Sequence, residues 1–388
     1  MSVSFFYNQL SFYVLACFIV TLVIQLCIHW IRFSKLAFLK KKLRPKLDEE
    51  LEPVSVVVCA RDSYEQLSEL VPALLRQDYP QFEVVIVNDC SEDETEAYLK
   101  DLERREPRIK CVQLRQHLNF FNGKKFPLSM GIKSASHDLI VLTDPDCRPT
   151  SEEWLRNMVS CYDRNTELVV GYARYENTSR LTNRLIRFDT LQEGTLFLSA
   201  ALKGHPFSGT GKNLSYRKKL FYNNKGFTSH YTMPAGDDDV FVSQVATKKN
   251  TKAFIDADNG IVATPTNSFW AWVRQRCNKY STIRLHQPHT RAMMALHYWS
   301  QFLFYACFIA LFLLKPAFGI EANIPYYIYY FPTIIVLFLL RYISQMIIYR
   351  GVTRRLGEHG LLGGLILWDA FFAIATPLFR ITGRMTKE

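Results

Sequence analysis

The chain has 388 residues, of which 48% are hydrophobic and 14% aromatic, and 47 basic against 36 acidic residues give it a formal net charge of +11 at pH 7. A basic chain suggests nucleic acid as a partner, but no zinc-finger or RNA-binding motif is present and much of the excess charge lies beside long apolar runs, so we expect no nucleic acid partner. The nine cysteines include no C-x-x-C pair, which excludes the common zinc and dithiol redox motifs.

The first element is a long apolar segment, "LSFYVLACFIVTLVIQLCIHWI" (10–31), which contains no lysine, arginine, aspartate or glutamate. A helix of this length can cross a bilayer. Because the segment lacks a basic start and a small-residue cleavage site, we expect residues 1–31 to be a retained transmembrane anchor. The basic stretch "RFSKLAFLKKKLRPK" follows, which is typical of the cytoplasmic side, so residues 32–52 are interpreted as a juxtamembrane linker.

Residues 53–290 have a different pattern, in which short apolar strands alternate with helices. Strands are predicted at 54–60, 82–89, 110–115 and 138–144, and helices at 64–77, 91–105 and 127–136. This alternation is typical of an α/β domain with a parallel sheet covered on both faces. Ligands of such sheets bind beyond the carboxyl ends of the strands.

Aspartates stand at three of these strand ends. Asp62 follows the first strand, Asp89 ends the second, and Asp144 and Asp146 follow the strand at 138–144. Taken alone, "DPDC" fits a turn in which aspartates bond nearby backbone amides as well as it fits a divalent cation site. Three acidic strand ends on one edge favour a site. No glycine-rich phosphate loop occurs, since "GTGKNLS" lacks the upstream glycine that a P-loop needs.

Three more apolar runs follow in residues 291–388, which we interpret as a C-terminal membrane region. The runs at 298–314 and 326–349, joined by "KPAFGIEANIP", are expected to span the membrane outward and back. The last run, 361–379, either spans or forms a re-entrant or interfacial helix. Arg341 and Asp369 lie inside these runs, where they could pair with each other, bind a lipid phosphate, or reach the interface.

Six segments of the middle region resemble a known family. They are "VSVVVCARD", "VVIVNDCSEDET", "GKKFPLSMGIKSASHDLIVLTDPDC", "GTGKNLSYRK", "AGDDDVF" and "WVRQRCNKY". Over roughly residues 54–280 they are similar to the membrane-bound inverting glycosyltransferases of family 2, and the flanking apolar runs are similar to the layout of its polysaccharide and glycolipid synthases. The resemblance implies the GT-A fold, a Rossmann-like α/β fold that takes nucleotide-diphosphate sugars.

The resemblance also implies roles for the strand-end residues. Asp62 and Asp89 fall where the family holds the nucleoside. Asp144 and Asp146 match the DxD motif, in which the second aspartate ligates Mg²⁺ or Mn²⁺ and the first helps to hold ribose or metal. The metal acts as a Lewis acid on the departing diphosphate. Lys124 stands where the family has a lysine near the nucleotide; a solvated loop lysine is the alternative.

Asp238, in "GDDDV", matches the general base that takes the proton of the acceptor, with Asp237 as the alternative residue. An acidic helix start would explain the same pattern without catalysis. In "WVRQRCNKY", Gln275 and Arg276 match part of a Q-x-x-R-W motif and are candidate diphosphate partners. No Arg-Trp pair follows, which argues against processive chain synthesis. The same helix is expected at the membrane surface, because Trp270 and Trp272 suit an interface.

From these features we expect a membrane-bound glycosyltransferase of hexosyltransferase type. It would transfer a sugar from a nucleotide sugar, expected to be a UDP-sugar, with inversion and Mg²⁺ or Mn²⁺, to a lipid or lipid-linked glycan. The reaction would take place at the cytoplasmic face of a bacterial inner membrane. The alternatives are a subunit of a processive polysaccharide synthase, and a catalytically silent scaffold that binds a nucleotide sugar or a partner synthase.

Overall fold

The computed structural model of the protein describes residues 3–40, 44–115, 123–233, 235–266, 268–314 and 325–385. Positions 41–43 of the basic stretch, and positions 315–324 of the expected connection between two spans, lie outside the described residues. The strands are β1 Val54–Ala60, β2 Phe82–Asp89, β3 Ile109–Leu114, β4 Leu139–Thr143, β5 Cys147–Pro149, β6 Leu168–Gly171, β7 Ala173–Tyr175, β8 Leu214–Arg217, β9 Thr251–Phe254 and β10 Ile261–Ala263.

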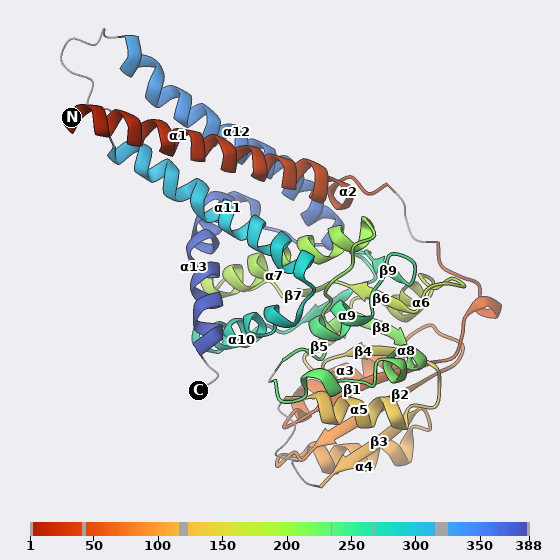
Figure 1. The fold of residues 1–388 in the computed structure, drawn as a ribbon. Coiled ribbons are helices and arrows are strands. Elements are labelled where there is room, and N and C mark those ends of the chain that lie inside the picture. The colour runs from red at the N-terminus through yellow and green to blue at the C-terminus, as the bar shows by residue number, and fades with distance from the viewer. Residues whose placement is uncertain are drawn as a thin grey trace.

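The helices alternate with these strands in the first part of the domain and dominate the two ends of the chain (Figure 1). The α-helices are α1 Val3–Cys27, α2 Ser34–Ala37, α3 Tyr64–Leu75, α4 Thr95–Arg105, α5 Lys125–Ser134, α6 Trp154–Val159, α7 Leu181–Leu202, α8 Lys218–Asn223, α9 Asp239–Val245, α10 Phe269–Ser281, α11 Pro288–Leu313, α12 Pro325–Leu356 and α13 Leu365–Met385. A π-helical segment, η1 Ile28–Phe33, joins α1 to α2, and short 3₁₀ segments are η2 Asp48–Glu50, η3 Gly211–Asn213, η4 Thr228–His230, η5 Ile283–Leu285 and η6 Leu362–Gly364.

The predicted α/β sheet is present as a seven-stranded sheet with the order β3-β2-β1-β4-β8-β6-β9. Strands β3, β2, β1 and β4 are parallel, whereas β8 runs antiparallel to both β4 and β6. A smaller sheet has the order β5-β10-β7. Because β1 pairs with β2 and β4 in parallel register, with Ala60 opposite Asn88 and Val58 opposite Thr143, the carboxyl ends of all three strands reach one edge of the sheet.

The central strand β1 is buried on both faces, as its unbroken run of apolar residues predicts. Val56 and Val58 point into a core formed with α3, α4 and α6. Val57 points to the opposite face and packs in a second core with α5. Alternation of side chains along the strand explains the division.

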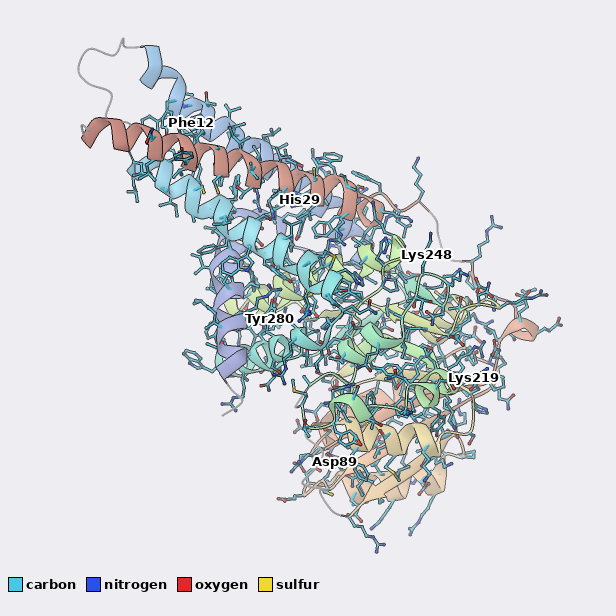
Figure 2. All side chains as sticks on the ribbon, in the orientation of Figure 1. Phe12, His29, Asp89, Lys219, Lys248 and Tyr280 are labelled. Atoms are coloured by element: carbon cyan, nitrogen blue, oxygen red, sulfur yellow. The ribbon has the colours of Figure 1, made fainter. Side chains whose placement is uncertain are left out.

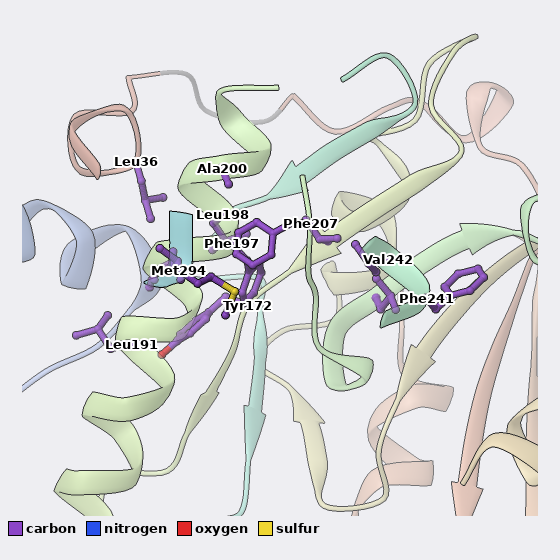
Figure 3. Close-up of a cluster of buried hydrophobic side chains, with 14 of the residues drawn as sticks. Leu36, Tyr172, Leu191, Phe197, Leu198, Ala200, Phe207, Phe241, Val242 and Met294 are labelled. Atoms are coloured by element: carbon purple, nitrogen blue, oxygen red, sulfur yellow. The ribbon is translucent and has the colours of Figure 1, made fainter. Parts of the chain in front are cut away.

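The second core continues without a break from the sheet into the apolar helices. Figure 3 shows part of it, with Leu36 of α2 and Met294 of α11 beside α7. The same cluster contains Phe241 of α9 and Phe372 of α13. The sheet domain and the helices at both ends of the chain are therefore packed as one body.

Four helical segments are long and apolar enough to cross a membrane: Gln9–Ala37, Pro288–Leu313, Tyr330–Leu356 and Leu362–Thr382. They overlap the four predicted apolar runs but begin or end elsewhere. The first continues past Ile31 to Ala37, through residues assigned to the linker, and α11 begins at Pro288 rather than at Tyr298. In Figure 1, α1, α11 and α12 run alongside one another, whereas α13 crosses at an angle and ends beside α10.

The two charges inside the apolar runs pair with each other. Arg341 Nη1 lies 2.8 Å from Asp369 Oδ2, and both side chains are buried. Gln345 and Tyr305 also donate to the carboxylate, at 2.7 and 2.8 Å, while the other guanidinium nitrogen donates to Gln25 at 3.0 Å. The network joins α1, α11, α12 and α13.

Candidate active site

Two lysines bring the DxD carboxylates together beyond the end of β4. Lys212 Nζ lies 2.5 and 2.6 Å from the two carboxylate oxygens of Asp146 and 3.4 Å from Asp144 Oδ2. Lys124 Nζ donates to Asp144 Oδ1 at 2.7 Å and lies 3.5 Å from Asp237 Oδ2. Burial alone would raise the pKa of Asp144, but the two lysines outweigh it and hold that pKa well below its ordinary value.

This arrangement fits a divalent cation held by two protein ligands. Asp144 and Asp146 converge on one positively charged point, which the Lys212 ammonium group marks. Among the described residues, no group of three or more aspartate, glutamate, histidine or cysteine side chains could hold a metal. The remaining ligands would have to be phosphate oxygens and water, which is the usual pattern for Mg²⁺ at sites that bind nucleotide phosphates.

The three consecutive aspartates have three different environments. Asp237 faces Lys124, and Asp239 accepts a hydrogen bond from Thr282 Oγ1 at 2.6 Å and lies 3.4 Å from His286 Nε2. Asp238 Oδ2 accepts the backbone N–H of Gly211 at 3.0 Å, and its other oxygen caps α9.

The pKa values of two of these aspartates diverge accordingly. Burial first, and then the charge of Asp237, raise the pKa of Asp238 to about 7. Burial also acts to raise the pKa of Asp239, but the hydrogen bond and charge of His286 outweigh it and bring that pKa to about 2. A carboxylate with a pKa near neutrality is suited to proton transfer, so Asp238 has the environment of a general base.

Asp144 and Asp238 line one cavity of about 190 Å³, which we call the central cavity. Lys212 also lines it, as do Gln275 and Trp272 of α10. Asp144, which could help to hold a cation, and Asp238, which could accept a proton, thus face the same space. A reacting group in this cavity would be in reach of both.

Asp62 and Asp89 lie at the ends of β1 and β2, on the same edge of the sheet as Asp144, but they do not line the central cavity. Figure 2 shows Asp89 in the part of the domain remote from the apolar helices. Asp62 has a positive φ of 45° and accepts the backbone N–H of Glu92 at 2.7 Å, which ties the loops after β1 and β2 together. The nucleoside roles of Asp62 and Asp89 stay predictions.

Helix α10 is held against α7 by buried charges. Arg276 donates to Glu193 at 2.7 Å and to Asp189, and Lys279 pairs with Glu193. Arg276 lines the central cavity, but Asp189 and Glu193 already neutralise its charge. Gln275 also lines the cavity, and its side chain has no hydrogen-bond partner in the described part of the chain. Their diphosphate roles stay predictions.

The two tryptophans of α10 differ from expectation. Trp270 is 73% exposed and could lie at an interface. Trp272 is buried, because its indole N–H donates to Asp189 at 3.0 Å and its rings pack against α13. The interfacial placement of Trp272 was therefore wrong: the position inside the protein satisfies its one polar atom.

Lys212 is the site residue that sequence reasoning missed. It lies in "GTGKNLS", which lacks the spacing of a P-loop. No strand is predicted from the sequence at β8, whose pairing with β4 brings this lysine to the site, so no local signal marks it. Glu193 was missed as well, since nothing in the helical pattern of α7 marks its inward-facing acids.

Comparisons with known proteins bear on the identity of this domain. Residues 55–225 match the model of glycosyl transferase family 2. An uncharacterized glycosyltransferase of Haemophilus influenzae is 26% identical over 117 residues, which are 30% of this chain and 34% of that protein. The poly-beta-1,6-N-acetyl-D-glucosamine synthase of Staphylococcus aureus is 25% identical over 189 residues, which are 46% of this chain and 42% of the synthase. The match thus covers less than half the length of each of these relatives.

Among solved structures, the mannosyltransferase PcManGT from Pyrobaculum calidifontis, in complex with GDP-Man and Mn²⁺, is similar with a TM-score of 0.63 at 17% identity. The similarity covers 98% of this chain and 100% of that one. At this identity it shows the fold alone, and the fold is the one that the sequence predicted. The chain therefore carries a glycosyl transferase family 2 domain with the GT-A fold.

Proposed function

We propose that the protein is a membrane-bound glycosyltransferase that moves a sugar from a nucleotide-diphosphate sugar to a lipid or lipid-linked glycan, with inversion at the anomeric carbon. One observation supports this most directly: the DxD carboxylate Asp144 and the candidate base Asp238 line the same cavity. The donor diphosphate would lie at the first and the acceptor hydroxyl at the second.

In this reaction Asp238 takes the proton of the acceptor hydroxyl, and the acceptor oxygen bonds to the anomeric carbon as the bond to the diphosphate breaks. The base stands on the face opposite the leaving group, which gives inversion. Asp144 and Asp146 would hold Mg²⁺ or Mn²⁺, which as a Lewis acid offsets charge on the departing diphosphate. Lys124 and Lys212 lie beside these carboxylates and would add positive charge toward the same group.

A membrane location is supported by the four apolar helical segments and by the basic residues Arg32 and Lys35 at the end of the first, and a bacterial inner membrane by the bacterial relatives. By the positive-inside rule the basic residues support a cytoplasmic location of the GT-A domain. The angle of α13, and its packing against α10 of the domain, favour the interfacial alternative for that helix.

The names of the staphylococcal relatives favour the alternative of a subunit of a processive polysaccharide synthase, in which the sugar would be N-acetylglucosamine. We rank it second because the motif on α10 departs from the one typical of processive synthases. The silent scaffold ranks third, since Asp144, Asp146 and Asp238 are all present and Asp144 and Asp238 line one cavity.

The test is turnover of a panel of nucleotide sugars by the detergent-solubilised chain with and without Mn²⁺ or Mg²⁺, in the presence of native membrane lipid. We expect metal-dependent release of nucleotide from one donor, with the loss of that release in Asp146→Ala and Asp238→Asn. Lipid-soluble product would support the single-transfer proposal, whereas a long polymer would favour the processive one. Tight donor binding without any turnover would favour the scaffold.

A further inference from the structure

A second and larger cavity lies where α10, α11 and α13 meet. It has a volume of about 530 Å³, and we call it the outer cavity. Apolar side chains from two of the membrane-type helices line it, among them Ala295 and Trp299 of α11 and Ile381 of α13. Figure 2 shows Tyr280, another lining residue, next to α13, whose Phe379 ring lies 6.3 Å from the Tyr280 ring. A volume of this size is typical of a ligand site.

The outer cavity carries an uncompensated positive charge. Arg284, Arg291 and Arg380 line it, and no acidic residue does. None of the three arginines forms an ion pair with a residue that the structure describes, in contrast to Arg276 of α10. Arg284 makes a long contact of 3.8 Å to the sulfur of Met233.

Arg380 is the most constrained of the three. Its Nε and Nη2 atoms are buried without a hydrogen-bond partner among the described residues. The guanidinium carbon lies 4.6 Å from the centre of the Tyr298 ring and 5.8 Å from that of Tyr280, so the rings hold the group in place. Burying polar atoms of a cation without an anion is costly, which points to a ligand that supplies the anion.

The shape and charge of the cavity select the class of ligand. Arginine binds phosphate with paired, charge-assisted hydrogen bonds. Basic pockets between membrane helices bind phosphate-bearing lipid head groups, and the lining of α11 and α13 offers an apolar wall for a lipid chain. The expected ligand therefore has an anionic head and a long apolar tail.

A third, smaller cavity of about 40 Å³ lies between the outer and central cavities. It shares Tyr280 and Ile283 with the outer cavity. It shares Arg276 and Lys279 with the central one. The three cavities thus follow α10 and the turn after it, since Lys279 is in α10 and Arg284 is in η5.

We infer that the outer cavity binds the phosphate or diphosphate group of a lipid-linked glycan, whose sugar hydroxyl reaches Asp238 along α10. This rests on the proposed function, and it narrows the acceptor. Asp238 lines the central cavity and not the outer one, so a phosphate held by Arg284, Arg291 and Arg380 is not itself the attacking group, and a sugar hydroxyl of the same ligand reacts. The proton then goes to Asp238, as the base requires.

The test is binding of farnesyl diphosphate and farnesyl phosphate to the full chain in phosphatidylcholine nanodiscs. Farnesol, inorganic diphosphate and phosphatidylglycerol serve as competitors. We expect at least one of the farnesyl anions to bind, and the double variant Arg291→Gln, Arg380→Gln to weaken that binding at least about tenfold. The exposed Arg291→Gln alone should give a smaller loss if the double variant does not fold. Arg274→Gln, on the exposed face of α10 and outside all three cavities, should bind as the unaltered chain does.

Unchanged binding in Arg291→Gln and in a folded double variant would overturn the inference, as would equal competition by phosphatidylglycerol, which would make the cavity a site for bulk anionic lipid. Equal competition by inorganic diphosphate would overturn the role of the lipid chain. Donor binding and slow donor hydrolysis are measured on the same variants. Arginine-dependent binding of a farnesyl anion in a chain that turns over no donor would support the lipid-phosphate site while overturning the transfer reaction.

Discussion

The pH dependence of transfer should report the electrostatic coupling between Asp237 and Asp238. With a pKa of about 7 for Asp238, roughly a tenth of this group is deprotonated at pH 6, so kcat/KM should be about tenfold below its plateau there. Asp237 is the second cause of the raised pKa, after burial. Replacing it with asparagine removes a negative charge, stabilises the deprotonated form of Asp238, and should move the rise in kcat/KM to lower pH.

The assay is a kcat/KM profile between pH 5 and 9 for the unaltered chain, Asp237→Asn and Asp238→Asn, with Asp101→Asn on the exposed surface of α4 as the matched control. Asp238→Asn should be slower by about 10²–10⁴-fold across the range. Donor binding is measured separately, because Asp237 also lies 3.5 Å from Lys124. If Asp237→Asn is as slow as Asp238→Asn, then Asp237 is the base. If its profile keeps the original midpoint, the charge coupling described above is refuted.

Three further outcomes follow from individual contacts. Lys212→Gln removes the ammonium group that pairs with the Asp146 carboxylate. In the absence of nucleotide, Mn²⁺ should therefore bind more tightly, as measured by electron paramagnetic resonance, although transfer should be slower. Weaker Mn²⁺ binding would contradict the idea that the ammonium group and the metal share one position. Gly131→Ala would place a methyl group 2.6 Å from a methyl group of Val57, so the free energy of unfolding should fall by about 1–3 kcal/mol. An unchanged midpoint of thermal unfolding would contradict this close packing. Asp369→Asn should lower the free energy of unfolding by about 3–5 kcal/mol, because it leaves the buried Arg341 unpaired. Replacing both Arg341 and Asp369 with leucine should recover most of that stability. A double variant as unstable as Asp369→Asn would contradict this explanation.

The sheet and its acidic edge could be predicted because they depend on local patterns. The run of valines in β1 and the aspartates after β1, β2 and β4 are each visible within a few residues of sequence. The start of α4 could not be predicted correctly: the helix was expected from Ser91, because residues 91–94 are of types that cap helices, but it begins at Thr95. They instead serve the neighbouring loop, where Asp93 accepts the backbone N–H of Tyr64 at 3.1 Å.

The missed parts of the site come from contacts between distant segments. Lys212 reaches Asp146 across 66 residues, and Arg276 reaches Glu193 across 83. No local pattern encodes such a meeting, since it depends on the antiparallel pairing of β8 with β4 and on the packing of α10 against α7. The same holds for Trp272, whose buried position depends on α7 and α13.

The close passage of α12 across α2 sets an order on how the chain is completed during synthesis. A side-chain carbon on Gly351 would lie 2.6 Å from the carbonyl oxygen of Ala37, so the two helices meet with no room to spare. At a synthesis rate of about 5–20 residues per second, roughly 15–60 s separate the emergence of these two positions. Until Gly351 is made, the surface around Ala37 lacks its α12 partner, whereas α7, which also contacts α2, is complete well before that point.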